Sequence, residues 1–289
     1  VGPIPMKLLR HGEPSREAPA VIPTGSDQVL DARPVTADFD SEFFEQDGLA
    51  RLQAAITGVG LSAIDITGNR LGPPLKRPGK IVCIGLNYRR HATEAGMAIP
   101  DEPIIFMKAP NTTVGPNDDV RIPRLSTKTD WEVELGVVIG SHTSYLDTPD
   151  VALEHVAGYV MSNDVSEREF QLERGGQWDK GKSCDTFNPL GPWIVTTDEM
   201  TNPQILDMWL DVDGHRQQSG RTSDMIFSVA HIVWYVSQFM VLEPGDLINT
   251  GTPAGVGSGK NPPRFLHPGQ EMRLGIDGLG EQLSRTIAT

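Results

Sequence analysis

Cysteine is nearly absent from this sequence of 289 residues, which contains only Cys83 and Cys184. The two lie far apart, with no CxxC spacing and no histidine cluster nearby. The sequence therefore indicates neither a zinc site nor the disulfide scaffold of a small secreted protein. A chain of this length can bury a sizeable core without disulfide bonds. We expect both cysteines to be small buried hydrophobic residues.

Basic residues are also in deficit. Lys and Arg number 25 while Asp and Glu number 38, which gives a net charge of −13. Nucleic acids and anionic membrane surfaces are bound through basic patches, so the deficit argues against both kinds of partner. It does not exclude a small anionic substrate, because a bound divalent cation can locally oppose the charge of the whole protein.

Long apolar runs are missing as well. The most apolar long window, residues 230–242, includes Ser237 and Gln238 and is too short to cross a bilayer. The first residues lack the basic and apolar regions of a signal peptide, so we expect a cytoplasmic protein. Met6 looks like a native start, which would make residues 1–5 a remnant of expression.

Glycine and proline, in contrast, are abundant, with 30 and 23 residues. Helix interiors tolerate little of either, which argues against a helix bundle. Apolar spacing predicts one helix over residues 43–57 and a second that begins at the cap cluster 222–224. Short apolar segments bounded by Pro, Gly, Asp and Asn predict strands. These strands cover residues 29–30, 63–67, 80–86, 104–107, 132–140, 156–162, 193–196, 204–212 and 246–249.

The many short strands favour a β-rich α+β fold. The turn-rich segment 71–79 contains three prolines and two glycines, which is typical of a linker. We place a domain boundary inside it, with a small N-terminal α/β domain over residues 1–72 and a larger domain over residues 73–289.

Two glutamates spaced by two residues mark the predicted strand 132–140. Side chains alternate along a strand, so Glu132 and Glu134 point to the same face. The run continues into apolar residues 137–139. If this face is buried, two ionised carboxylates need a positive partner between them, and a hard divalent cation with oxygen ligands would serve. The alternative is a strand face exposed to solvent.

A third carboxylate follows the predicted strand 156–162. Asp164 is either the N-cap of the helix-like segment after it or the third member of a carboxylate triad for Mg²⁺ or Mn²⁺. In that segment Arg168 and Gln171 are three residues apart, so on a helix both would address one ligand. Otherwise they belong to an exposed helix face.

A histidine and a glutamate three residues apart follow the predicted strand 80–86. On one helical turn His91 and Glu94 can hydrogen-bond, and a carboxylate beside an imidazole orients the ring and raises its basicity. Such a pair suits a general base that activates water. The alternative is a short solvated helix.

Residues 176–183 formally match the phosphate-loop pattern GxxxxGK[ST]. That loop functions only between a buried strand and a helix N-terminus, and this segment has neither, so an NTPase is rejected. Lys182 is either a surface lysine or a fixed cation that meets a carboxylate or a developing enolate.

In the glycine-rich segment 250–257, Thr252 offers a hydroxyl to a ligand or belongs to a plain surface turn.

In their joint order these segments resemble the fumarylacetoacetate hydrolase family over about residues 72–289. The resemblance rests on Asn-Tyr-x-x-His-Ala-x-Glu at 87–94, Phe-Met-Lys at 106–108, Glu-x-Glu at 132–134, Asn-Asp-Val-Ser-Glu-Arg-Glu at 163–169, Gly-Lys-Ser-Cys-Asp-Thr-Phe at 181–187 and Thr-Gly-Thr-Pro-Ala-Gly-Val-Gly at 250–257. Residues 178–187 and the total length look most like bacterial members that hydrolyse 2,4-diketo-3-deoxy sugar acids, such as rhamnonate and fuconate derivatives. Many members have Thr-Ala-Arg-Asp where residues 166–169 are Ser-Glu-Arg-Glu, and the arginine is kept.

The resemblance implies a mixed β-sandwich roll with a small N-terminal domain, and a homodimer. The implied metal is Mg²⁺ or Mn²⁺, with Glu132, Glu134 and Asp164 as ligands. The implied catalytic residues are His91 and Glu94, a water-activating dyad on a mobile lid, and Lys182. The positions that match substrate contacts are Arg168, Gln171 and Thr252.

The activity that the resemblance implies is hydrolysis of the C3–C4 bond of a 2,4-dioxo acid, with water attacking the C4 carbonyl. The products are pyruvate and a carboxylic acid. Three alternatives stay open: decarboxylation of oxaloacetate or another β-keto acid, a lyase or isomerase reaction such as that of ureidoglycolate lyase, and a binding module without catalysis.

Overall fold

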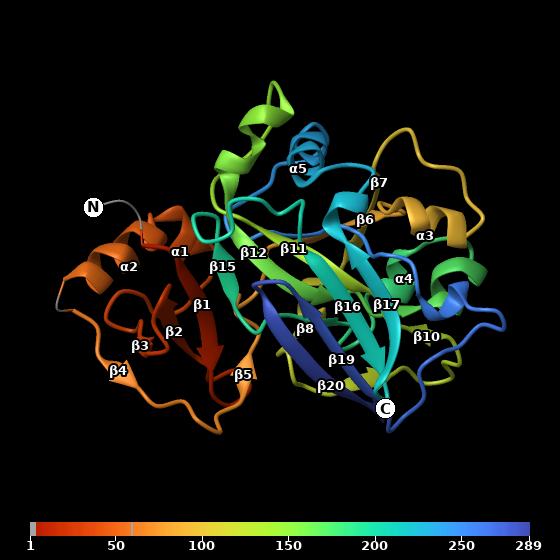
Figure 1. Cartoon of the computed structure of the whole chain (residues 1–289), viewed down its shortest axis with the longest axis horizontal. Helices are drawn as coiled ribbons and strands as arrows, with labels where there is room; N and C mark the ends of the chain where they lie inside the picture. Colours follow the sequence, from red (N-terminus) through yellow and green to blue (C-terminus); the bar gives the residue numbers. More distant parts are fainter. Residues whose placement is uncertain (1–3, 59) are drawn as a thin grey trace.

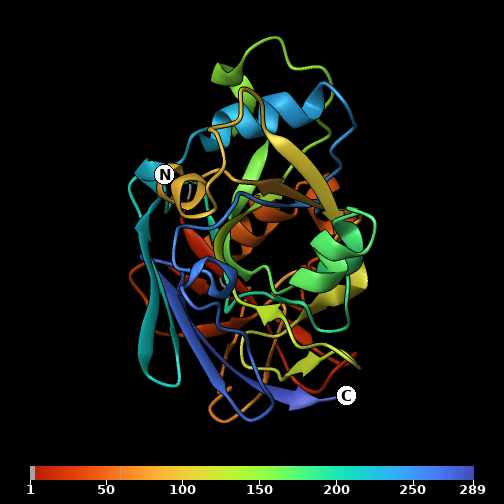
Figure 2. The same ribbon diagram turned by 90° about the vertical axis from the view of Figure 1, so that its right-hand side faces the viewer.

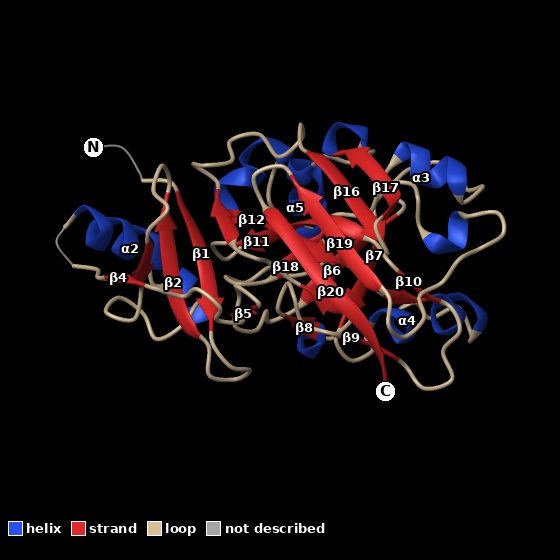
Figure 3. Ribbon diagram, turned by 60° about the horizontal axis from the view of Figure 1, so that its bottom comes forward, coloured by secondary structure: helices blue, strands red, loops and turns tan. Residues whose placement is uncertain are grey.

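The structure is a computed structural model that describes residues 4–58 and 60–289. The predicted expression remnant falls partly on residues 1–3, which lie outside the described residues. Strands dominate over helices, as the sequence predicts, and they form two larger sheets (Figures 1 and 3). Within the described chain, no helix combines the length and apolar character needed to cross a bilayer.

The first sheet has eleven strands, and its order alternates between distant parts of the sequence. Along the main path the strands are β4 (Ala63–Ile64), β3 (Val29–Asp31), β2 (Ala18–Pro23), β1 (Met6–His11), β15 (Ile194–Thr196), β12 (Val156–Asn163), β11 (Val133–Ile139), β18 (Leu247–Asn249), β6 (Ile81–Gly85) and β7 (Ile104–Lys108). Strand β5 (Leu71–Gly72) pairs with β1 off this path. The strands predicted in this part of the sequence are confirmed, with ends that shift by one to three residues.

The central strands β11 and β12 are buried along their whole length. They pair antiparallel, with Val133 opposite Asn163 and Leu135 opposite Met161. Burial on both faces explains why their sequences are almost continuously apolar instead of alternating. A Cβ atom on Gly136 would lie 2.8 Å from a methyl carbon of Val160, so a glycine is required for these strands to pack as they do.

The second sheet has five strands and covers one face of the first (Figures 1 and 3). Its order is β17 (His215–Arg221), β16 (Asp207–Val212), β19 (Glu271–Ile276), β20 (Gly280–Ala288) and β9 (Val120–Ile122). One apolar cluster joins the odd-numbered Val133, Leu135 and Val137 of β11 to Met208 and Leu274 of this sheet. Because side chains alternate along a strand, the even-numbered residues of β11 point away from the second sheet.

Two further pairs of short strands complete the sheets. They are β10 (Thr129–Asp130) with β13 (Ser166–Glu167), and β8 (Thr113–Val114) with β14 (Asn188–Pro189). The pair β10–β13 corrects a prediction, because residues 166–171 were expected to be helical throughout. Residues 166–167 instead extend to pair with β10, and only residues 169–173 form a single π-helical turn.

The helices are short, and two predictions about them were wrong in detail. The helix predicted over 43–57 is two helices, α1 (Ser41–Glu45) and α2 (Gly48–Thr57), because Asp47 adopts a left-handed conformation with φ 53°. The helix predicted to begin at 222–224 begins later, as α5 (Val229–Ser237), and its N-cap is Ser228. Residues 222–224 form a separate 3₁₀ turn, as do residues 110–112, 149–155 and 257–259.

The N-terminal strands continue the first sheet instead of forming a sheet of their own. Lys7 of β1 pairs with Val195 of β15, and a second apolar cluster packs Leu8 and Phe43 against Ile81 and Leu247. The division into domains at residue 72 stays a prediction, because strands on both sides of it share one sheet and one core.

Two short helices lie at the end of the molecule away from the N-terminal strands (Figures 1 and 2). They are α3 (Arg89–Glu94), which follows β6, and α4 (Asp179–Lys182). Both carry residues that the sequence singles out for chemistry, so this end of the first sheet holds the candidate site.

The cap of α5 can be tested by substitution. Ser228 accepts a hydrogen bond from the His231 amide at 3.2 Å, so Ser228→Ala should lower the free energy of unfolding by about 1 kcal/mol. The matched control is Ser223→Ala, at an exposed residue of the cluster first expected to hold the cap, and it should change little. Urea denaturation of the two variants distinguishes the sites, and equal losses would contradict Ser228 as the cap.

Candidate active site

Three carboxylates meet where β11 begins and β12 ends. Glu132 precedes β11, Glu134 lies in it, and Asp164 follows β12, with its amide donating to the Glu132 carbonyl at 2.9 Å. One oxygen from each of the three lies within 4.8 Å of the others, and all three residues are buried. The strand face is therefore not exposed to solvent. Asp164 precedes strand β13, so it is not the N-cap of a helix.

Lys182 joins two of these carboxylates. Its ammonium donates to Glu132 Oε2 at 2.7 Å and to Asp164 Oδ2 at 2.8 Å, and the side chain is buried. A Cβ atom on the preceding Gly181 would lie 2.4 Å from the Glu167 carbonyl oxygen. The glycine and lysine of the phosphate-loop pattern are thus explained by close packing of α4 and by an ion pair, which supports rejection of an NTPase.

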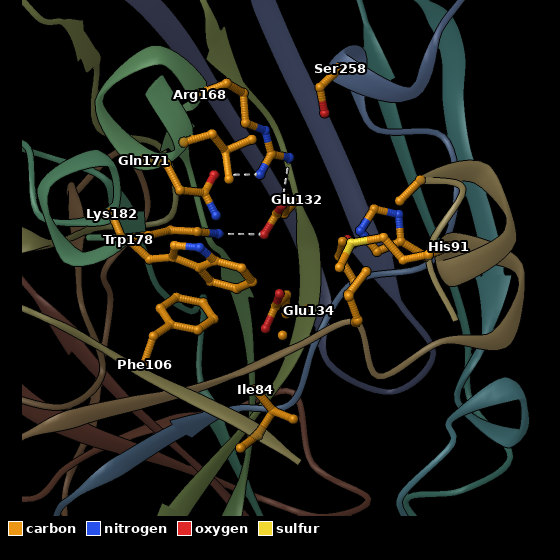
Figure 4. A pocket seen from close by; sticks show the side chains of 16 residues that line it. Ile84, His91, Phe106, Glu132, Glu134, Arg168, Gln171, Trp178, Lys182 and Ser258 are labelled. Atoms are coloured by element: carbon orange, nitrogen blue, oxygen red, sulfur yellow. Dashed lines mark hydrogen bonds and ion pairs between the residues drawn. The ribbon is translucent and has the colours of Figure 1, made fainter. Parts of the chain in front are cut away.

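Arg168 is held by three hydrogen bonds, one to each of three side chains around it. Its guanidinium donates to Asp130 at 2.8 Å, to Glu132 at 2.6 Å and to the Gln171 amide oxygen at 3.0 Å. The contact with Gln171 fixes the orientation of that amide, whose nitrogen is directed toward the pocket (Figure 4). Asp130 in turn accepts hydrogen bonds from the amides of Gly257 at 2.6 Å and Ser258 at 3.0 Å, which ties Arg168 to the glycine-rich loop.

Two functional residues were not found from the sequence as individuals. Lys108, the last residue of β7, donates to Asp164 Oδ1 at 2.5 Å and to the Val165 carbonyl at 3.1 Å, and it is buried. Asp130 precedes the glutamate pair. The available signal was a charged residue at the end of an apolar strand, but only the sheet order shows which carboxylate each strand end meets.

The buried charges of the site do not balance. Four carboxylates, of Asp130, Glu132, Glu134 and Asp164, surround three cations, of Lys108, Arg168 and Lys182. Among the described residues none of these cations forms an ion pair with Glu134, whose carboxylate accepts from the Gly251 amide at 2.8 Å. The excess negative charge therefore lies at Glu134.

The pKa values of the two glutamates move in opposite directions for this reason. Burial would raise the pKa of Glu132, but Lys182 and Arg168 outweigh burial and lower it to about 2. Burial together with the charges of Asp164 and Glu132 raises the pKa of Glu134 well above its usual range.

The donor set fits a divalent cation. Carboxylate oxygens are the ligands that hard cations prefer, and oxygens bound to one such ion at about 2.0–2.6 Å lie within about 5 Å of one another. The three oxygens meet that condition without movement of the strands. A cation here would also supply the positive charge that Glu134 lacks.

His91 and Glu94 form the dyad that their spacing predicts. The His91 Nδ1 atom lies 3.1 Å from Glu94 Oε2, and this contact directs Nε2 of the ring to its other side. His91 lines the same pocket as the carboxylates and faces Lys182 across it (Figure 4). Both side chains are largely buried, so the face of α3 that carries them is not exposed to solvent.

Glu94 also fastens α3 to the glycine-rich loop. Its carboxylate accepts the Gly255 amide at 2.9 Å, and a Cβ atom on Gly259 would lie 2.5 Å from the carboxylate carbon. Burial would raise the pKa of Glu94, but the hydrogen bonds from His91 and Gly255 lower it overall. The loop therefore favours the ionised form of Glu94, which orients the His91 ring.

Thr252 lies at the pocket but is already engaged. Its hydroxyl donates to the Val133 carbonyl at 2.9 Å and accepts from the Gln218 amide at 2.8 Å. The hydroxyl joins the loop to β11 before any ligand is considered. A role for Thr252 in contacting substrate stays a prediction.

Comparison with known proteins agrees with this arrangement. Residues 80–287 match the description of the fumarylacetoacetate hydrolase C-terminal domain. The chain belongs to the fumarylacetoacetate hydrolase family. Enzymes of this family often use divalent metals, and the buried triad is suited to one.

Relatives of the chain include both hydrolases and isomerases by name. A protein of Burkholderia cenocepacia, provisionally named a hydrolase, is 51% identical over 284 residues, which cover 97% of this chain and 99% of the relative. The solved fumarylacetoacetate hydrolase of Exiguobacterium antarcticum is 35% identical with a TM-score of 0.84, covering 98% of this chain and 100% of that one. A Mycobacterium abscessus protein, provisionally named 2-hydroxyhepta-2,4-diene-1,7-dioate isomerase, is 32% identical with a TM-score of 0.82, covering 98% and 99%.

The contribution of Lys108 can be measured without an activity assay. Lys108→Met leaves the buried Asp164 with one cation fewer, so in the presence of EDTA the variant should lose about 3–5 kcal/mol of unfolding free energy. Saturating Mg²⁺ should restore more stability to the variant than it adds to the unsubstituted protein, because the ion replaces the missing positive charge.

Thermal denaturation with EDTA and with Mg²⁺ checks this expectation. The control is Lys80→Met, which removes the partner of the buried Asp246 far from the triad and should show no added dependence on Mg²⁺. Equal effects of Mg²⁺ on both variants would contradict a role for Lys108 in balancing the triad.

Proposed function

We propose that this protein is a divalent-cation-dependent hydrolase that cleaves the C3–C4 bond of a 2,4-dioxo acid to pyruvate and a carboxylic acid. The observation that carries the proposal is that a histidine–glutamate dyad faces a buried lysine and a carboxylate triad across one pocket. Each half alone occurs in many proteins. Together they supply a base for water and a cationic environment for an enolate.

The polar half of the pocket suits the 2-oxo acid end of the substrate. Gln171 offers its amide nitrogen, since its oxygen is occupied by Arg168. Lys182 uses two of its three N–H groups on Glu132 and Asp164, which leaves the third for a substrate oxygen. The residues that would hold the cation are Glu132, Glu134 and Asp164, and the bound ion would stabilise negative charge on the 2-oxo oxygen as a Lewis acid.

His91 would then act on water. With Nδ1 directed at Glu94, Nε2 is left to accept a proton from a water molecule in the pocket. The resulting hydroxide adds to the C4 carbonyl, the C3–C4 bond breaks, and its electrons pass to the enolate of pyruvate. Lys182 stabilises that charge, and protonation at C3 completes pyruvate.

An isomerase is the second candidate, and the structural neighbour provisionally named as one supports it. Moving a double bond next to a 2-oxo acid also passes through an enolate, so the Lys182 half of the site would serve both reactions. The two reactions differ in their use of water, because hydrolysis consumes a water molecule and isomerisation does not.

A panel of substrates with Mg²⁺ separates these functions. It comprises acylpyruvates, a 2,4-diketo-3-deoxy sugar acid, oxaloacetate and 2-hydroxyhepta-2,4-diene-1,7-dioate, with products identified by mass in H₂¹⁸O. Hydrolysis places one ¹⁸O atom in the carboxylic acid released, whereas isomerisation leaves the mass unchanged and decarboxylation releases CO₂. No turnover combined with retained binding would favour a binding module.

Removal of the proposed general base should strongly reduce hydrolysis without changing metal binding. His91→Ala is expected to lower kcat for hydrolysis by about 10²- to 10⁴-fold, because the general base is lost. Mg²⁺ affinity measured by calorimetry should stay the same, since the triad is untouched. Thr93→Ala, at an exposed residue of the same helix, is the control and should keep its activity. Full hydrolytic activity of His91→Ala would refute the role of the dyad.

Gly259 gives a way to disturb the dyad indirectly. Gly259→Ala places a methyl group 2.5 Å from the Glu94 carboxylate carbon, which should displace the carboxylate from His91 and lower kcat about tenfold or more. Gly60→Ala is a matched control, because its Cβ atom would make only ordinary contact at 3.4 Å. Steady-state kinetics would contradict the expectation if both variants matched the unsubstituted enzyme.

A further inference from the structure

The pocket has a polar half and an apolar half. The polar half holds the carboxylates, Arg168, Gln171 and Lys182, whereas the other walls are formed by Ile84, Leu86, Met97, Phe106 and Trp178. From this division we infer that the acyl end of the substrate is apolar and uncharged, so that the substrates are acylpyruvates with an aliphatic or aromatic tail. The inference rests on the proposed function, since it assigns the second half of a 2,4-dioxo acid.

The apolar wall is built around two aromatic rings. Phe106 comes from β7 and Trp178 lies just before α4, and their ring centroids are 5.4 Å apart at an interplanar angle of 63°. Figure 4 shows both rings on the same side of the pocket, beside Lys182. Rings that pack edge to face restrict each other, so this wall presents a defined surface to a ligand.

Gly85 makes room for this wall. A Cβ atom at Gly85 would lie 2.8 Å from the ring of Trp178, so the indole can occupy its position only because β6 ends in glycine. The backbone of Gly85 is not in the left-handed region, so its role is space and not conformation. Gly85 thus leaves space for the Trp178 ring next to the proposed catalytic groups.

The apolar wall directly adjoins the polar groups of the site. The Lys182 ammonium lies 4.9 Å from the centroid of Phe106 while it donates to Glu132 and Asp164. A substrate whose enolate oxygen meets Lys182 and whose C4 carbonyl faces His91 has its remaining atoms between those groups and the apolar residues. The tail must therefore contact that surface.

Charge argues against a second carboxylate on the tail. The two cations that line the described part of the pocket are already bound to carboxylates, Arg168 to Asp130 and Glu132, and Lys182 to Glu132 and Asp164. His91 is engaged by Glu94. A distal carboxylate would lie against hydrocarbon without a partner, which is costly.

Hydroxyl groups on the tail would lack partners for the same reason. Of the pocket hydroxyls, that of Thr252 is engaged by Val133 and Gln218. The Ser258 amide shares Asp130 Oδ2 with Arg168, which places this serine in the polar half. A polyhydroxylated tail would bury its hydroxyls against the rings, so the structure disfavours a sugar acid and favours a hydrocarbon tail.

The test compares 2,4-dioxo acids that differ only in the tail. We expect kcat/KM to rise from acetylpyruvate to hexanoylpyruvate by about fourfold for each methylene that contacts the wall, and benzoylpyruvate to be accepted. Succinylpyruvate and a 2,4-diketo-3-deoxy sugar acid should be poorer than acetylpyruvate. A preference for either of these two would overturn the inference and leave the proposed hydrolysis intact.

Two variants connect the preference to the wall. Gly85→Ala and Trp178→Ala should each lower the ratio of kcat/KM for hexanoylpyruvate over acetylpyruvate at least tenfold. The first does so by displacing the indole and the second by removing it. Leu125→Ala, at a fully exposed apolar residue outside the pocket, is the control and should leave the ratio unchanged. An unchanged ratio in both wall variants would refute the assignment.

Binding separates failure of the inference from failure of the proposed function. Pyruvate, 2-oxooctanoate and 2-oxoglutarate are titrated calorimetrically in the presence of Mg²⁺, without any need for turnover. Tighter binding of 2-oxooctanoate than of the other two supports the apolar subsite even if no dioxo acid is cleaved. Tighter binding of 2-oxoglutarate would overturn it.

Discussion

The structure depends on the concentration of buried negative charge where β11 begins and β12 ends. Three carboxylates brought together without solvent repel one another, and three buried cations pair with two of them. Lys108 and Lys182 pair with Asp164, and Lys182 and Arg168 pair with Glu132. Glu134 is left with a single backbone amide. With Asp130 included, the cluster has one cation fewer than it has carboxylates. A bound divalent cation would supply the missing positive charge.

The same charges order the rest of the site. Asp130, which holds Arg168, also accepts the amides of Gly257 and Ser258, and Glu94, which orients His91, accepts the amide of Gly255. One short glycine-rich loop therefore joins Arg168 to the pair of His91 and Glu94. The close approaches at this loop leave no room for side chains, which explains its glycines by geometry.

Local patterns in the sequence were enough to predict the central strands, as short apolar segments bounded by turn residues, and to single out the carboxylates in and beside them. Glu132 and Glu134 share a face because the strand period is two, and His91 and Glu94 meet because the helical turn joins residues three apart. Partners that meet only through the sheet order could not be predicted: Lys108 reaches Asp164 from another strand, and no local pattern indicates which carboxylate it meets. The segment after Asp164 was misassigned because pairing between β13 and β10 outweighs its helical pattern.

This site explains how a strongly acidic chain could bind the anionic substrate of the proposed reaction. A chain with a net charge of −13 does not as a whole attract an anion, and without an ion the site itself has more carboxylates than cations. A divalent cation converts a deficit of one charge into an excess of one, and it does so only within the pocket. An anionic 2-oxo acid is then attracted at one place on an otherwise repulsive protein, while the apolar wall of Phe106 and Trp178 accepts the part of the molecule that carries no charge.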